Sequence, residues 1–171
     1  IKNLKILNMY KRAPNSDDYW TVGAGVMMTG SDISVHDNFM SDAFYCVSIG
    51  GGSVAGTSRN IKIYNNEITH CDVGLNAALG TDGVSFDGVE IYNNHIYGSD
   101  NWDGYVPYNP YDSSRTFHRR DGIKLWGRPT DLSSSIKNLF IYNNVIGPDI
   151  TKISGASSGA IVMDTSDFNN V

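Results

Sequence analysis

The sequence predicts an all-β protein organised as a parallel β-helix, and two observations support this prediction. A pattern of the form Ile-x-Ile-Tyr-Asn-Asn-x-Ile recurs along the 171-residue chain, and a second short apolar segment follows each copy. Full or degenerate copies start at Leu4, Ile33, Ile61, Val89 and Leu139, which gives steps of 29, 28, 28 and 50 residues. Two or three short strands repeated about every 28 residues fit one turn of such a helix.

The first segment of each unit alternates apolar and other residues, as Ile61 and Ile63 do with Lys62 and Tyr64. A period of two indicates a strand with one buried face. The Asn-Asn pair that follows favours a sharp bend, because Asn tolerates a left-handed backbone. An apolar residue then returns to the core at Met40, Ile68, Ile96 and Ile146.

The second segment of each unit predicts another short strand. Its copies are Gly25–Met28, Cys46–Ile49, Gly74–Ala77, Gly122–Leu125 and Gly159–Met163. No amphipathic stretch of helical period is long enough to compete, which argues against helical repeats of similar length.

Equivalent residues of successive turns should lie about 4.8 Å apart, so that like side chains stack on like. We expect three such columns, namely an amide ladder of Asn65, Asn93 and Asn143, an interior column of Ile63, Ile91 and Ile141, and an outer column of Tyr64, Tyr92 and Tyr142. These residues are interpreted as scaffold.

These units, followed by Asp-Gly-Ile strands such as Asp121–Ile123, resemble the right-handed parallel β-helix proteins of the pectin-lyase-like superfamily. The resemblance covers residues 3–163 and implies a right-handed helix of five to six turns and a secreted or cell-surface location. That superfamily includes polysaccharide lyases, glycoside hydrolases, uronan epimerases, phage tailspikes and adhesins. The fold therefore does not by itself define the function.

Composition narrows the possible partners of what we expect to be one domain, residues 1–171. A net charge of −5 argues against nucleic acid as a partner. No apolar run approaches membrane-spanning length, and no signal peptide is visible. Both ends fall inside repeats without polar caps, so we expect the chain to be part of a longer β-helix.

Cys46 and Cys71 are the two cysteines. In the repeat alignment Cys71 matches Ala43, which places the two cysteines three positions apart along the strand direction, or about 10 Å. This separation exceeds the reach of a disulfide bond. The alignment therefore predicts two free, buried thiols.

The 50-residue step indicates an insertion of about 22 residues between Ile96 and Gly122, with a functional loop at about 97–121. Five aromatic residues argue against disorder in this loop: Trp102, Tyr105, Tyr108, Tyr111 and Phe117. Aromatic rings offer apolar faces to sugars, so Trp102, Tyr105 and Tyr108 are candidate substrate-binding residues. The alternative is that they only cover the side of the helix.

A basic cluster of six residues falls within 14 positions at the end of the loop and just after it, in an otherwise acidic protein. Its members are Arg115, His118, Arg119, Arg120, Lys124 and Arg128. Such a cluster could bind an anionic polymer such as a polyuronate. The alternative is a solvated loop whose charges pair with Asp112 and Asp121.

The strand after the insertion should direct Ile123 and Leu125 inward and Lys124 and Trp126 outward. Lys124 then extends an outer row formed by Ser48 and Asn76. Asp72, Asp82 and Asp164 border this row, and His118 and Asp121 lie where the loop meets the scaffold.

Two chemistries suit these residues. A lyase needs a base and a cation beside the uronate carboxylate, and the resemblance implies an Arg or Lys base with Ca²⁺ as a candidate cofactor. Lys124, Arg119 or Arg120 could serve as base, and Asp121 with Asp100 or Asp103 could hold Ca²⁺. A hydrolase needs two carboxylates, for which Asp100, Asp103, Asp121 and Asp164 are candidates.

The sequence thus predicts an enzyme that cleaves an extracellular polysaccharide, with uronate-containing chains among the candidates. The candidate catalytic residues are Asp121, Lys124, His118, Arg120 and Asp103; the candidate substrate-binding residues are Trp102, Tyr105, Tyr108, Arg119, Trp126 and Asn76; and the candidate metal ligands are Asp100 and Asp103. The alternative is a non-catalytic glycan-binding β-helix of the tailspike or adhesin kind, because no motif in the chain is diagnostic of catalysis.

Overall fold

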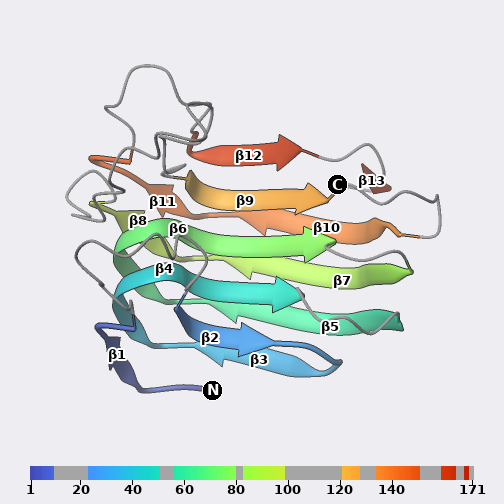
Figure 1. Ribbon diagram of the computed structural model, residues 1–171, viewed down its shortest axis with the longest axis horizontal. Coiled ribbons are helices and arrows are strands. Elements are labelled where there is room, and N and C mark those ends of the chain that lie inside the picture. Colours follow the sequence, from blue (N-terminus) through green and yellow to red (C-terminus); the bar gives the residue numbers. More distant parts are fainter. Residues whose placement is uncertain are drawn as a thin grey trace, which may run out of the picture.

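The computed structural model describes residues 1–9, 23–50, 56–79, 83–98, 121–127, 134–150, 159–164 and 168–169. Every regular element in these ranges is a β-strand, and all of the strand pairings are parallel (Figure 1). The prediction of an all-β protein with parallel strands is confirmed. None of the described segments contains a helix that could cross a membrane.

The strands form two sheets. The eight-stranded sheet contains β1 (Lys5–Leu7), β2 (Ala24–Met28), β4 (Phe39–Gly50), β6 (Glu67–Leu79), β8 (His95–Tyr97), β9 (Asp121–Gly127), β11 (Val145–Ile146) and β12 (Ile161–Asp164). The five-stranded sheet contains β3 (Ile33–His36), β5 (Gly56–Tyr64), β7 (Val84–Tyr92), β10 (Ile136–Tyr142) and β13 (Phe168–Asn169). Along the chain, each repeat adds strands to both sheets.

The register of the five-stranded sheet confirms the repeat from Ile33 onward. Ile33 pairs with Ile61, Ile61 with Val89, and Val89 with Leu139. The copy placed at Leu4 is wrong, because β1 belongs to the other sheet and pairs with β4. Simple alternation occurs in strands of both sheets, so it could not distinguish them.

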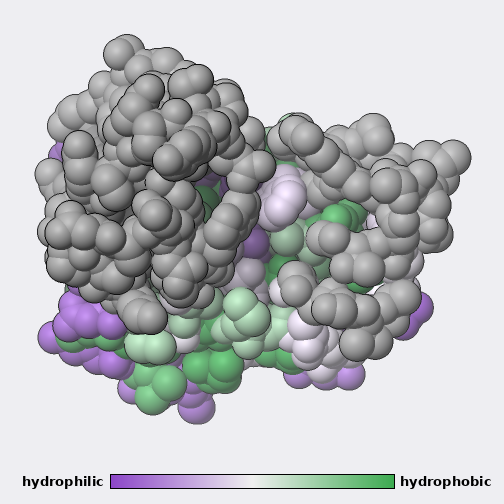
Figure 2. Space-filling view, viewed as in Figure 1, coloured by the Kyte–Doolittle hydropathy of each residue, from purple (hydrophilic) through white to green (hydrophobic). Residues whose placement is uncertain are grey.

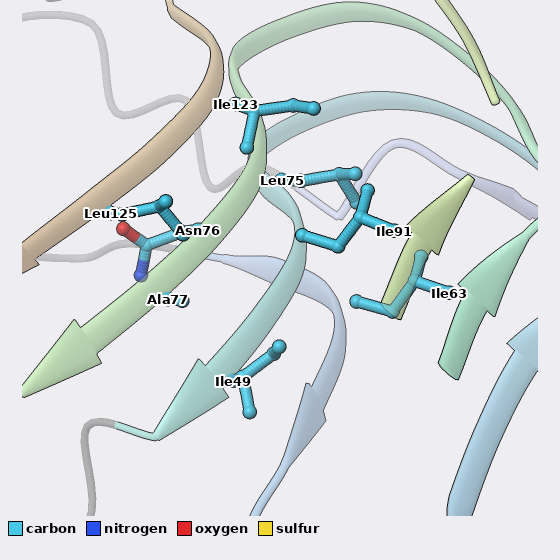
Figure 3. A pocket seen from close by; sticks show the side chains of 8 residues that line it. All are labelled: Ile49, Ile63, Leu75, Asn76, Ala77, Ile91, Ile123 and Leu125. Atoms are coloured by element: carbon cyan, nitrogen blue, oxygen red, sulfur yellow. The ribbon is translucent and has the colours of Figure 1, made fainter. Parts of the chain in front are cut away.

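The space between the sheets is an aliphatic core (Figure 3). One small gap within this core is bordered by Ile49, Ile63, Leu75, Asn76, Ala77, Ile91, Ile123 and Leu125, and it leaves no room for a water molecule. Ile63 and Ile91 are buried and Ile141 packs against the same core, as predicted for the interior column. Among the described residues, this gap therefore belongs to the scaffold and has no room for a ligand.

A buried amide ladder runs through the bend, but the second Asn of each pair forms it. Asn38, Asn66, Asn94 and Asn144 are its members, and each side-chain Nδ2 donates to the next Oδ1 at 2.9 Å. The prediction that the first Asn of each pair forms the ladder is wrong. Asn65 instead has a φ of 53° and donates to Asp37 at the exposed side of the bend.

The two Asn residues of a pair have separate structural roles. The first has a positive φ in every copy, 53° at Asn65, 55° at Asn93 and 54° at Asn143. That conformation turns the chain, and Asn adopts it more readily than most residues. The second residue then points inward, where Asn66 and Asn94 are 2% and 1% exposed.

The outer tyrosine column is confirmed. The rings of Tyr64 and Tyr92 lie 4.9 Å apart, those of Tyr92 and Tyr142 lie 5.0 Å apart, and both pairs are parallel within 2°. His36 extends the column, with its ring 4.6 Å from that of Tyr64.

Cys46 and Cys71 form a disulfide bond, so the prediction of two free thiols is wrong. The alignment behind it is right, because Ala43 pairs with Cys71. The error lies in treating the chain between Ala43 and Cys46 as straight. Ala43 and Cys46 are both buried, although residues three positions apart on a straight strand would face opposite sides. β4 is not straight but curves strongly (Figure 1). The bend brings the Cα atoms of the two cysteines to 6.0 Å, within disulfide reach.

The strand register also defines the position and the length of the insertion. Tyr97 pairs with Thr69 and Asp121 pairs with Val73, so a step of four residues in β6 becomes 24 residues between β8 and β9. The insertion therefore adds 20 residues here. The other two residues of the long step lie between β9 and β10, where paired positions are nine rather than seven residues apart.

Both ends of the strand stack expose large apolar side chains. At one end these are Ile1, Leu4, Leu7, Met9 and Met27, and Figure 2 shows apolar surface over β1 and β2. At the other end they are Phe140, Tyr142, Val145, Ile161 and Met163. Edge strands pair on one side only, which leaves their side chains less covered.

Replacing an inner member of the amide ladder should destabilise the protein. The substitution Asn66→Ala removes amide bonds to Asn94 and Asn38 and to the carbonyl oxygen of Val35, in a site closed to water. We expect the free energy of unfolding in urea to fall by about 2–4 kcal/mol. The matched change Asn65→Gly keeps the left-handed bend available and should cost about 0.5 kcal/mol or less. Equal losses in the two variants would contradict this assignment.

Candidate functional site

The outer row predicted beside the insertion exists in the eight-stranded sheet. Ser48 pairs with Asn76, Asn76 with Lys124, and Lys124 with Val162. Met27 pairs with Ser48 at the other end of the row. Parallel pairing thus brings one hydroxyl, one amide and one ammonium group from three repeats into line.

The row is polar but largely closed to solvent. Ser48 and Asn76 are each 3% exposed and Lys124 is 9% exposed. Their neighbours Ile123 and Leu125 point into the core, as alternation predicted. Buried polar groups require partners, because leaving one unsatisfied costs about 1–3 kcal/mol.

Hydrogen bonds connect the row to Trp126. The amide Nδ2 of Asn76 donates to Ser48 Oγ at 3.0 Å, and Trp126 Nε1 donates to Asn76 Oδ1 at 2.8 Å. Lys124 Nζ lies 5.2 Å from the centre of the Trp126 ring, within cation–π range. Asn76 therefore orients the indole, and the indole in turn faces the ammonium group.

Asp121 is the first residue of β9, directly after the insertion, and it is fully buried. Its Oδ1 accepts a hydrogen bond from Gly159 N at 3.0 Å, which ties the start of β9 to the next repeat. Asp72, from β6, is 2% exposed. Two carboxylates thus lie in the buried part of this region.

Tyr45 shares the electrostatic environment of the two aspartates. It pairs with Val73, which in turn pairs with Asp121. Burial, followed by the negative charges of Asp72 and Asp121, raises the pKa of Tyr45 from 10.0 to about 12. Tyr45 therefore keeps its phenolic proton over the whole physiological range, and the site can offer a neutral hydroxyl beside two carboxylates.

Four of the predicted site residues belong to this arrangement: Asn76, Asp121, Lys124 and Trp126. The predicted residues Asp100, Trp102, Asp103, Tyr105, Tyr108, His118, Arg119 and Arg120 lie outside the described residues. Within the described ranges, no three His, Cys, Asp or Glu side chains gather as a metal-binding group.

Tyr45 is the member of this region that sequence reasoning missed. Its signal was available in the repeat alignment, because Tyr45, Val73 and Asp121 occupy equivalent positions in three successive repeats. Asp72 was expected only at the border of the row.

Comparison of the chain with protein-family models, curated proteins and solved structures finds no match. The functional proposal therefore depends on the residues of the site and on the resemblance of the repeats.

Tyr45 should ionise at higher pH than an ordinary tyrosine. A pKa of 10.0 in the unfolded chain and about 12 in the native state means that the native state binds more protons between these values. This contribution to stability is complete below the lower pKa and is lost as the pH rises through the upper one. Ultraviolet titration of wild type and Tyr45→Phe should differ by one step centred near the upper value.

The variant Asp72→Asn provides the control for that titration. It removes one of the negative charges, so the Tyr45 step should move to lower pH. A Tyr45 step centred at the ordinary tyrosine pKa in the wild type would show that this hydroxyl is not in the environment described.

Proposed function

We propose that the chain is a right-handed parallel β-helix of the pectin-lyase-like kind and that it cleaves an extracellular polysaccharide by lyase or hydrolase chemistry. The observation that carries this proposal is the polar row Ser48–Asn76–Lys124, with Asp121 and Trp126, beside the point where the chain re-enters the sheet after the insertion. Long insertions on rigid scaffolds are common locations of function.

Parallel strands in near-constant register and a buried amide ladder support the proposed fold. From β3 onward each repeat contributes strands to both sheets, and the pairs β3–β5, β4–β6 and β5–β7 all have an offset of 28 residues. Because outward and inward positions alternate along each strand, a different outward residue in one repeat changes the surface and leaves the core column unchanged. The equivalent outward position is occupied by a different residue in each of three repeats, namely Ser48, Asn76 and Lys124.

The charged groups of the row fit both proposed chemistries. In a lyase, the Lys124 ammonium would neutralise a uronate carboxylate, which makes the adjacent carbon acid easier to deprotonate. In a hydrolase, Asp121 would be one of the two carboxylates, acting as acid, base or nucleophile. Trp126, held by Asn76, would give a sugar ring a fixed apolar face.

Burial sets a condition on either chemistry. Asp121 is 0% exposed and Lys124 is 9% exposed, so this face must open before a polymer reaches them. Exclusion of water strengthens electrostatic interactions at such groups.

Ca²⁺ belongs to the lyase version of the proposal. Asp121 supplies oxygen donors of the kind that Ca²⁺ prefers. Its proposed companions, Asp100 and Asp103, lie outside the described residues. A chelator provides the direct test of this part.

The Cys46–Cys71 disulfide bond supports the proposed secreted or cell-surface location. Disulfides persist in oxidising compartments and are rare in the cytosol of most cells.

Burial of the candidate catalytic groups is the observation that favours the second candidate function. The contacts of Asn76 and Trp126, and those of Asp121 with the next repeat, also suit a purely structural role. A glycan-binding β-helix needs no accessible acid or base. It would use outer side chains and leave the polymer intact.

Incubation with a panel of neutral and uronic polysaccharides, with and without a chelator, tests the proposal. A rise in ultraviolet absorbance from unsaturated ends supports a lyase, and new reducing ends without that rise support a hydrolase. Bound but uncleaved polymer supports the binder.

Two substitutions then test the site itself. Asp121→Asn and Lys124→Gln keep the approximate side-chain size and should each lower the cleavage rate by about 100-fold or more. Lys137→Gln, an exposed change on β10, is the matched control and should retain the wild-type rate. If both site variants fold normally and keep the wild-type rate, the chemistry lies elsewhere.

A further inference from the structure

The tyrosine column forms a regular strip on the outer face of the five-stranded sheet. Tyr64, Tyr92 and Tyr142 come from β5, β7 and β10, and their ring centres repeat at 4.9 and 5.0 Å. We call these three residues, together with Phe140, the tyrosine strip. Phe140 lies two positions before Tyr142 on β10, and the two are 47% and 42% exposed.

The facing rings of Tyr64, Tyr92 and Tyr142 cover one another, so between them a ligand can reach only the hydroxyl groups and the ring edges. Tyr142 OH donates to Glu90 Oε2 at 3.3 Å. Among the described residues, the hydroxyls of Tyr64 and Tyr92 have no hydrogen-bond partner. A phenol can both donate and accept a hydrogen bond, so the strip presents a line of adaptable polar groups above apolar rings.

The charges beside the strip are paired. Lys62 Nζ lies 2.8 Å from Glu90 Oε1, and this contact raises the pKa of Lys62 and lowers that of Glu90. His36 Nδ1 lies 2.7 Å from Asp37 Oδ2 at the other end of the column. The strip therefore lacks the excess positive charge that an anionic polymer would require.

We propose that the tyrosine strip is a second polysaccharide-binding site, which holds an extended, hydroxyl-rich neutral segment running across the strands. For its ligand class the proposal rests on the proposed function. Sugar units of an extended glycan repeat at nearly the same spacing as strands in a sheet, so successive sugars can meet successive tyrosines.

Because the spacing of the tyrosines matches that of the sugar units, several weak contacts can form at once and together hold the polymer. Once one sugar is bound, the next tyrosine meets its partner at a high effective concentration. Tyr142 has a ring neighbour on one side only within the described chain, so its other face can receive the apolar face of a sugar. The strip would hold a long polymer on a different sheet from the Lys124 row.

The test uses a variant that removes the hydroxyls but keeps the rings. In Tyr64→Phe/Tyr92→Phe/Tyr142→Phe the aromatic column and its packing are preserved, so the thermal midpoint should stay near that of the wild type. Tyr97→Phe is the matched control, because it removes a phenolic hydroxyl from the other sheet, where Tyr97 OH bonds Glu67.

Native gels containing hydroxyethyl cellulose, glucomannan, polygalacturonate or alginate provide the measurement. At least one neutral polymer should retard the wild type and Tyr97→Phe, and the triple variant should bind it about tenfold or more weakly. Retention of full binding by the triple variant would overturn the proposal, as would no retardation by any neutral polymer.

Cleavage of short oligosaccharides separates this proposal from the proposed function. Such substrates cannot bridge the two sheets, so the triple variant should cleave them at the wild-type rate. If the strip tyrosines are needed for retardation but no polymer is cleaved, the binding site is supported and the proposed enzymatic function is contradicted. If the polymer is cleaved but the triple variant is retarded as strongly as the wild type, the enzymatic function is supported and the binding site is contradicted.

Discussion

The fixed register between repeats is the constraint on which the rest of the structure depends, and the amide ladder enforces it. Asn66 Oδ1 accepts both the backbone N–H and the side-chain amide of Asn38, at 3.2 and 2.9 Å. Asn94 and Asn144 repeat the arrangement. A slip by one residue would break every rung and turn each strand's core face outward. The ladder therefore holds both the core and the outer rows in place.

Fixed register lets the two outer faces differ while the core stays uniform. On the five-stranded sheet, tyrosines recur at one position and produce a regular strip. On the eight-stranded sheet, the equivalent residues Ser48, Asn76 and Lys124 differ in each repeat, and the change to lysine comes directly after the insertion. A face on which the same side chain recurs in each repeat suits a ligand that itself repeats. A face on which that side chain changes between repeats suits a localised site.

Much of the fold could be predicted because it depends on local alternation and a repeat that is visible in the sequence. The stacked tyrosines, the interior isoleucines and the alignment of Lys124 with Asn76 followed from spacing alone. The disulfide did not, because the curvature of β4 is a three-dimensional property that a straight-strand estimate ignores. The pattern does not show which Asn of a pair takes the left-handed backbone, so it cannot distinguish Asn65 from Asn66 as the member of the buried ladder.

The candidate site was predictable in position but not in environment. Alternation correctly sent Lys124 to the opposite side from Ile123, but it could not show that the lysine would be nearly closed to solvent. The raised pKa of Tyr45 depends on burial and on two aspartates distant in sequence.

An NMR titration of the isotope-labelled protein with a short oligosaccharide from the cleaved polymer tests most directly whether the polymer binds at the Lys124 row. We expect the indole N–H signal of Trp126 and the backbone signals of Asn76 and Lys124 to shift together with one dissociation constant. Saturable binding that leaves these three residues unperturbed would contradict it.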